Sequence, residues 1–261
     1  MTGILEKDIE IEGENLHYLE SGKGDPLILL HPVTVTAKTQ WTNHLPLLAN
    51  HFRVLAPDLR GHGGSSNNSH GPMKPQDLMQ DIIAFVQALN IEKPLICGWS
   101  FGGQIALEIG IQFPTIPNAL ISGGVMYAPT EGYISTLKSW GINGQGDVDF
   151  EVFMTNFPNA APFLEKIHSD WKELFMQLSK MWYAPDNFVF PGQKVKTILN
   201  PVLLILGDRD SIINVEHAVQ MFRMIPNSQL AIFPNRDHDL PNYSVKMLCD
   251  TILTFWKQIK H

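Results

Sequence analysis

Short apolar runs, separated by helical patterns, constrain the fold of this chain more than any other feature. Residues 26–31 hold four consecutive apolar residues between a proline and a histidine, and similar runs recur at 52–56, 94–97, 119–121, 201–206 and 230–233. A strand has such a run when both faces of its sheet are covered, whereas a half-exposed strand alternates. Apolar residues between most runs follow helical spacing, as over 77–89. We therefore predict an α/β fold with a mostly parallel central sheet flanked by helices.

Two segments depart from this rhythm. Residues 7–20 alternate in polarity around a central Gly-Glu-Asn, which predicts a hairpin at one edge of the sheet. From about 127 to 197 no buried-strand run occurs, and a glycine-rich loop at 141–146 precedes a helical pattern that we extend over 159–183 as one helix. We predict a single core domain of residues 1–127 and 198–261, with a helical cap inserted at 128–197.

Composition narrows the classes of function. The 261 residues carry a net charge of −7, and only 17% are charged, against about 25% in typical proteins, which argues against a nucleic-acid partner. No apolar run approaches the roughly 18 residues of a membrane helix, and charge appears too early for a signal peptide. We expect a cytoplasmic protein, monomer or homodimer, with no membrane partner. Neither cysteine, histidine nor carboxylate spacing indicates a metal site.

The motif with the clearest chemistry is Gly-Trp-Ser-Phe-Gly-Gly at residues 98–103. It follows a predicted buried strand and precedes a helical stretch, which is the context of a Gly-x-Ser-x-Gly nucleophile elbow. In such a turn Gly98 and Gly102 relieve crowding, and the helix N-terminus places backbone N–H groups near developing negative charge. The alternative is a Gly-Ser turn that enters a helix by chance. The flanking strand and helix favour Ser100 as a nucleophile.

A serine nucleophile needs a base that is itself oriented by an acid. Asp208 and Asp210 follow the apolar run at 201–206, and either aspartate fits the position of the acid. His238 follows the next apolar run, after an intervening helical pattern, and is the one of ten histidines that we assign as the base. The chain order serine, aspartate, histidine agrees with a nucleophile elbow on a parallel sheet.

With Leu-Leu-His-Pro at 29–32 and Pro-Asp-Leu-Arg-Gly-His-Gly at 57–63, these motifs resemble the α/β-hydrolase fold enzymes, specifically serine hydrolases with a helical cap. The resemblance covers nearly the whole chain, but its motifs are not specific to a substrate. It implies that Asp210, fourth in a Gly-x-x-Asp turn, is the acid and that Asp208 is a structural turn residue. It also implies an oxyanion hole formed by the N–H groups of Val33 and Phe101, and no cofactor or metal.

Two positions depart from the family pattern. Pro32 stands where glycine usually follows the histidine, and proline has no N–H, although the donor implied by the resemblance is the next residue, Val33. Asp237 precedes His238, where a glycine is common. If Asp237 faced the imidazole, it would favour the protonated ring, and the acid limb of the activity profile would lie at a higher pH than usual.

The expected reaction follows from Ser100 and from the inserted segment. Haloalkane dehalogenases and epoxide hydrolases resemble this scaffold but carry aspartate as the nucleophile, whereas serine indicates an acyl-enzyme. The insertion is rich in aromatic residues, some of which should line an apolar cleft. We predict a hydrolase for a small-molecule carboxylic ester with a modest apolar acyl group. The alternatives are a C–C bond hydrolase, a lactonase or a perhydrolase on the same scaffold, or a non-catalytic ligand receptor.

Overall fold

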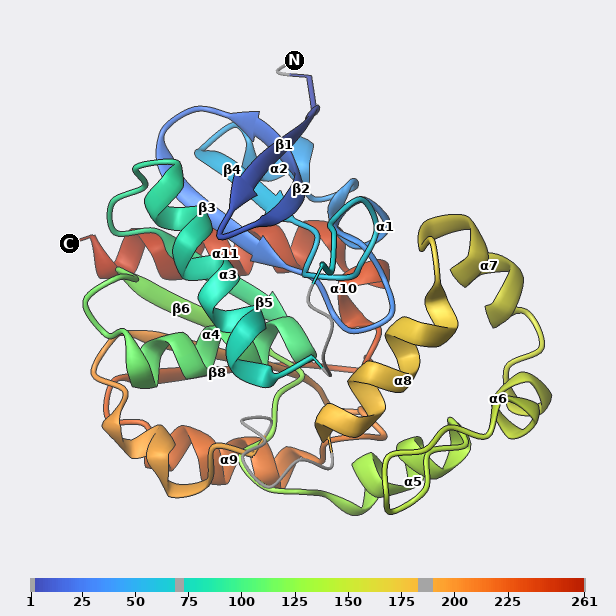
Figure 1. Ribbon diagram of the computed structural model, residues 1–261. Helices are drawn as coiled ribbons and strands as arrows, with labels where there is room; N and C mark the ends of the chain where they lie inside the picture. The colour runs from blue at the N-terminus through green and yellow to red at the C-terminus, as the bar shows by residue number, and fades with distance from the viewer. Residues whose placement is uncertain (1–2, 69–72, 183–189, 261) are drawn as a thin grey trace.

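The computed structural model describes residues 3–68, 73–182 and 190–260. Its centre is an eight-stranded sheet with the order β1-β2-β4-β3-β5-β6-β7-β8 (Figure 1). The β1–β2 and β2–β4 pairs are antiparallel and all the others are parallel, which confirms the predicted mostly parallel sheet and its edge hairpin. The strands are β1 (Leu5–Ile11), β2 (Glu14–Gly22), β3 (Asp25–Leu30), β4 (Phe52–Pro57), β5 (Leu95–Trp99), β6 (Ala119–Gly123), β7 (Val202–Gly207) and β8 (Ser228–Phe233).

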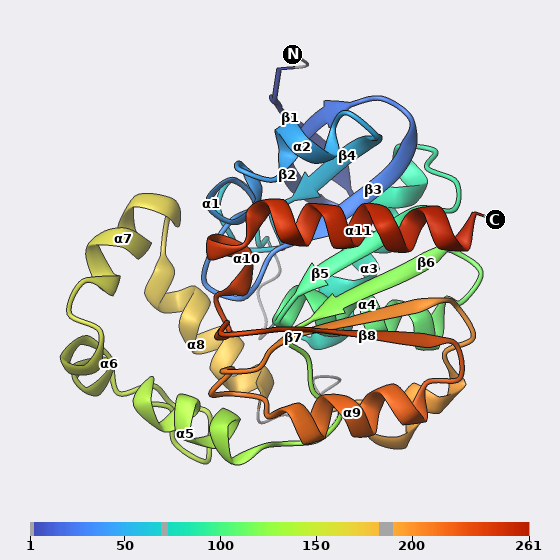
Figure 2. The ribbon, with the colours of Figure 1, turned by 180° about the vertical axis from the view of Figure 1, so that it is seen from behind.

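Helices cover both faces of the sheet, as Figures 1 and 2 show from opposite sides. Because successive side chains of a strand point to opposite faces, Ile28 and Leu30 of β3 lie in one apolar core while Leu27 and Leu29 lie in the other. The first core is covered by α3 (Pro75–Ala88), α4 (Phe101–Gln112) and α9 (Val215–Met224). The second is covered by α1 (Ala37–Trp41), α2 (Leu45–Leu48), α10 (Leu240–Tyr243) and α11 (Val245–Ile259).

The segment between β6 and β7 is helical. It contains α5 (Glu131–Ser139), α6 (Phe150–Asn156), α7 (Ala160–Ile167), α8 (Trp171–Trp182) and the 3₁₀ helix η1 (Gly192–Thr197). In both views α5, α6 and α7 form an arc that stands away from the sheet, and α8 returns toward it (Figures 1 and 2). Among the described residues, no helix has the length and apolar character needed to cross a membrane.

The prediction of a single helix over 159–183 is wrong, because the helical backbone is interrupted between α7 and α8. His168 has an extended backbone and ends α7. The side chain of Asp170 then accepts the N–H of Glu173 at 3.0 Å, as an N-cap residue does at a helix start. A capping aspartate therefore begins a second helix inside one apolar pattern. Tyr183, the last residue of the predicted helix, lies outside the described residues.

A buried ion cluster joins the hairpin to α3. Arg60, which follows β4, places its guanidinium 2.7 Å from a carboxylate oxygen of Glu14 and 2.6 Å from one of Asp81. The Glu14 and Asp81 side chains are 5% and 3% exposed, so both charges depend on Arg60 for compensation. Burial raises the pKa of the Asp81 carboxyl although the guanidinium opposes that shift.

Replacing Arg60 by methionine should therefore lower the free energy of unfolding by about 3–5 kcal/mol, because two buried carboxylates lose their partner. Burial favours a protonated carboxyl, so the loss should be smaller in mildly acidic buffer than in neutral buffer. Arg53→Met is the matched control, since Arg53 pairs with Glu20 but is about a third exposed, and it should cost about 1 kcal/mol or less. Equal losses in urea denaturation of the two variants would contradict this account.

Candidate active site

Ser100 lies in the turn between β5 and α4, with φ 52° and ψ −117°, a strained conformation for a residue with a side chain. The neighbouring glycines make this turn possible. A Cβ atom on Gly98 would lie 2.1 Å from the carbonyl oxygen of Gly102, and one on Gly102 would lie 2.4 Å from that of Leu30. The Ser100 N–H donates to the carbonyl of Gly123 at 2.7 Å. The turn is thus held against β3 and β6, and the position of the serine is fixed.

The side chains of Ser100, His238 and Asp210 form one continuous chain of hydrogen bonds. Oδ2 of Asp210 lies 2.7 Å from Nδ1 of His238, and Nε2 of the same ring lies 3.0 Å from Oγ of Ser100. Because a carboxylate only accepts, Nδ1 carries the proton, and the neutral ring leaves Nε2 free to accept the proton of the serine hydroxyl. This arrangement can transfer a proton from the hydroxyl to the imidazole.

Backbone groups fix the orientation of Asp210. Its second oxygen, Oδ1, accepts the N–H groups of Ile212 and Ile213, each at 2.9 Å, and its side chain is fully buried. Asp208 lies elsewhere: its backbone N–H donates to Phe233 at the end of β8, and it makes a long contact of 3.4 Å with the N–H of Arg236. Of the two aspartates considered from the sequence, the structure brings Asp210 to the histidine.

Trp99 and Gly124 position His238, and sequence reasoning missed both. The indole N–H of Trp99 donates to the carbonyl of His238 at 2.8 Å. Gly124 follows β6 with φ +59°, and a Cβ atom there would lie 2.9 Å from Cε1 of His238. Trp99 occupies the variable position of the serine motif, and Gly124 is one of two adjacent glycines, so neither carries a local signal. Both contacts join residues that are more than a hundred positions apart in the sequence, so only the tertiary structure shows them.

Val33 and Phe101 both line the cavity that contains Ser100. Val33 lies in the loop after β3, and the ring of His31 fixes the peptide that precedes it. Nε2 of His31 accepts the N–H of Leu59 at 2.9 Å, so Nδ1 donates to the carbonyl of Pro32 at 2.7 Å. In a planar trans peptide the N–H points opposite to the carbonyl, so this bond also sets the direction of the Val33 N–H.

Asp237 does not meet the condition on which its expected effect rested. Its Oδ1 atom accepts the N–H of Asp239 at 3.0 Å. Among the described residues, the carboxylate that forms an ion pair with the His238 ring is that of Asp210. Adjacent loop residues can point in different directions, and only the tertiary structure shows which way each side chain turns.

The cavity beside Ser100 is narrow, with a volume of about 50 Å³. Both the sheet domain and the helical insertion contribute to its walls. From the core come Val33, Ser100, Phe101, Gln104, Gly124, Met126 and Ile212, and from the insertion come Tyr133, Thr136, Leu137, Trp140 and Trp182. Gln104 is anchored by a hydrogen bond from Nε2 to the carbonyl of Met126 at 2.8 Å. The lining is predominantly apolar, as in sites for small organic molecules.

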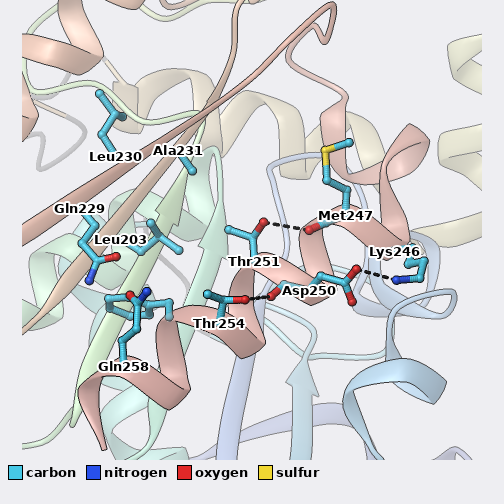
Figure 3. A pocket seen from close by; sticks show the side chains of 11 residues that line it. Leu203, Gln229, Leu230, Ala231, Lys246, Met247, Asp250, Thr251, Thr254 and Gln258 are labelled. Atoms are coloured by element: carbon cyan, nitrogen blue, oxygen red, sulfur yellow. Dashed lines mark hydrogen bonds and ion pairs between the residues drawn. The ribbon is translucent and has the colours of Figure 1, made fainter. Parts of the chain in front are cut away.

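A larger hollow of about 620 Å³ lies between β8 and α11 (Figure 3) and does not include Ser100. Four of its polar side chains form hydrogen bonds within α11. Lys246 pairs with Asp250 at 2.6 Å, and the hydroxyls of Thr251 and Thr254 donate to carbonyls one turn earlier. The narrow cavity, which contains Ser100 at the end of the hydrogen-bond chain, is therefore the candidate site. The described part of the chain does not gather three or more metal-ligating side chains.

Comparison with known proteins places the chain among hydrolases. Residues 27–246 match the model of a family described as the alpha/beta hydrolase family. The 2-hydroxymuconate semialdehyde hydrolase of Pseudomonas sp. (strain CF600) is 28% identical over 86% of this chain and 83% of its own length. The pimeloyl-[acyl-carrier protein] methyl ester esterase of Nitrosospira multiformis is 27% identical over 85% of this chain and 90% of its own.

The solved structures show the same fold. The enol-lactonase of Burkholderia xenovorans superposes with a TM-score of 0.75 at 20% identity, covering 96% of this chain and all of the other.

Gly124→Ala should displace the imidazole of His238, because the added methyl carbon would lie closer to the ring than van der Waals contact allows. The positive φ at this position adds backbone strain. A misplacement of about 1 Å can cost 100-fold in rate, so we expect kcat to fall about 10- to 100-fold. Gly144→Ala is the matched control, since a Cβ atom there meets nothing within 4 Å. Steady-state kinetics with unchanged far-UV dichroism would test this, and wild-type kcat in Gly124→Ala would contradict it.

Asp237→Gly should leave the pH dependence of kcat/KM unchanged, because the Asp237 carboxylate bonds to the backbone of its own turn. Profiles of wild type and variant, measured on one substrate across the acid limb, provide the comparison. A shift of that limb to lower pH in the variant would show that Asp237 acts on the ring after all.

Proposed function

The chain belongs to the alpha/beta hydrolase family, and on that premise we propose that it is a serine hydrolase that cleaves a carboxylic ester with a small apolar acyl group. One observation carries the proposal: the Asp210–His238–Ser100 hydrogen-bond chain ends in an apolar cavity. Such a chain activates a serine hydroxyl, which is otherwise a weak nucleophile.

In the first half of the reaction, Oγ of Ser100 attacks the ester carbonyl carbon while Nε2 of His238 takes the hydroxyl proton. The carbonyl oxygen becomes an oxyanion, which the N–H groups of Val33 and Phe101 stabilise. Asp210 holds the ring in its tautomer and stabilises the imidazolium. Collapse of the tetrahedral intermediate breaks the ester C–O bond, and His238 gives the proton to the departing alkoxide.

In the second half, water attacks the acyl carbon of the acyl-enzyme while His238 removes its proton. The second tetrahedral intermediate releases the carboxylic acid, and the proton returns to Oγ of Ser100. Proton and charge therefore balance over one cycle, with water consumed, an acid and an alcohol released, and the enzyme regenerated.

The lining of the cavity supports a neutral and small acyl group. No lysine or arginine lies among the described residues that line it, so a carboxylate or phosphate on the acyl group would lose its hydration without a compensating charge. A volume of about 50 Å³ is the space of about three to four water molecules, which fits a short chain better than a fatty acyl group.

A second candidate is hydrolysis of a C–C bond. The substrate in the name of the Pseudomonas relative contains no ester, so a similar scaffold can serve another hydrolysis. That compound carries a carboxylate, however, and the described lining offers no cation to receive one. We therefore place the ester first, in agreement with the name of the Nitrosospira relative.

The test is a series of p-nitrophenyl esters from acetate to decanoate, with a vinylogous 1,5-diketone as the C–C arm. We expect kcat/KM to be highest at short chains and to fall steeply beyond about six carbons, because longer chains exceed the cavity. Ser100→Ala should lose at least about 1000-fold in kcat. Ser139→Ala is the matched control, because it also removes a serine hydroxyl, one in α5 that donates to the Thr136 carbonyl.

Two outcomes would overturn the proposal. Cleavage of the diketone with no cleavage of any ester would assign the C–C reaction instead. Absence of both activities, with no covalent labelling of folded wild type by a fluorophosphonate, would indicate a non-catalytic receptor.

A further inference from the structure

The loop that carries Val33 is strained at Thr34, four residues after the end of β3. Thr34 has φ +67°, a region that a β-branched residue rarely adopts. Such a conformation persists only where surrounding contacts determine it. Because Thr34 directly follows Val33, any relaxation of its backbone would also turn the Val33 N–H. What holds Thr34 therefore acts together with the bond from His31 to the Pro32 carbonyl on the direction of the predicted oxyanion donor.

His168 makes that contact from the helical insertion. Its Nδ1 atom accepts the N–H of Gly63 at 3.0 Å, which leaves Nε2 to donate to the carbonyl of Thr34, also at 3.0 Å. The residue is 5% exposed. Burial lowers the pKa of its imidazole, which keeps the ring in the neutral tautomer that this pair of bonds requires.

Two imidazole N–H groups thus bracket Val33. His31 holds the carbonyl of Pro32 and His168 holds the carbonyl of Thr34. The ring of His62 packs between the two histidines, with centroids 5.0 Å from that of His31 and 5.5 Å from that of His168. His31 belongs to the sheet domain, whereas His168 lies between α7 and α8, 134 residues from Thr34 in sequence. The loop is therefore set jointly by the core and by the insertion.

We propose that His168 is a positioning residue that holds the turn at Thr34 and so aims the Val33 N–H at the oxyanion, making the helical insertion part of the catalytic geometry as well as a wall of the cavity. This inference rests on the proposed function. It predicts that loss of the Nε2 donor lowers the rate of the chemical step while substrate binding, which depends on the cavity walls, changes little.

Two substitutions separate the contacts of the ring. Asparagine places an amide near the position of Nδ1, so His168→Asn can still accept from Gly63 but does not reach Thr34. Glutamine is one carbon longer, so His168→Gln can place an amide N–H near the position of Nε2 and donate to Thr34. His217→Asn is the matched control, because the His217 ring also accepts a backbone N–H at 3.0 Å, but from Tyr127, which follows β6 and not β3.

The measurements are kcat, KM and Tm on a short p-nitrophenyl ester. We expect His168→Asn to lower kcat about 10- to 100-fold with KM within about threefold of wild type, and His168→Gln to recover most of kcat. His217→Asn should lower Tm without lowering kcat. Glutamine rescue is the readout that a merely structural role would not produce.

Wild-type kcat in His168→Asn would overturn the inference while leaving the proposed function intact. So would equal losses of kcat and Tm in the asparagine and glutamine variants, since these would reduce His168 to support for the fold. A wild-type protein that hydrolyses no ester would overturn the proposed function, and with it the role of His168. Ester hydrolysis by the wild-type protein therefore separates failure of the proposed function from failure of the role of His168.

Discussion

The backbone contact between the start of α4 and the strands β3 and β5 is the constraint on which the rest of the site depends. Gly98 and Gly102 approach so closely that neither position has space for a Cβ atom, and Ser100 is left with a positive φ between them. A residue held in this way cannot move toward a partner. His238 and Asp210, the proposed base and acid, reach it from the loops after β8 and β7, two strands that follow β5 and β6 in the sheet order. Parallel strands make this possible because their carboxyl ends meet at one edge.

The sequence is informative wherever one residue type is required locally. Uninterrupted apolar runs predict the buried strands, and the glycines of the serine motif predict its turn, because no other residue fits there. The choice of Asp210 over Asp208 needed the family resemblance, since both aspartates lie in the same turn after β7. What the sequence does not show is direction. The Asp237 side chain accepts a backbone N–H of its own turn. Gly124 leaves space for the ring of His238, more than a hundred residues away in sequence, and His168 of the helical insertion bonds to the loop after β3. These depend on the packing of elements that are distant in the chain.

The helical insertion contributes to the site in two ways. It supplies apolar walls beside Ser100, formed by Tyr133, Leu137, Trp140 and Trp182. These walls agree with the proposed neutral substrate. In the proposal above, His168 also holds the loop that carries the Val33 N–H. An insertion with both roles would link the shape of the substrate to the geometry of the oxyanion contacts, because displacement of α7 and α8 would alter the walls and the donor together.

The central claim is that Ser100 is the nucleophile and becomes acylated. The most direct measurement is the intact mass of the protein after acid quenching during turnover of a p-nitrophenyl ester, followed by peptide mapping. We predict a mass increase equal to one acyl group, located on Ser100 and absent from Ser100→Ala. An acyl group on a different residue, or turnover by a protein that never carries one, would contradict it.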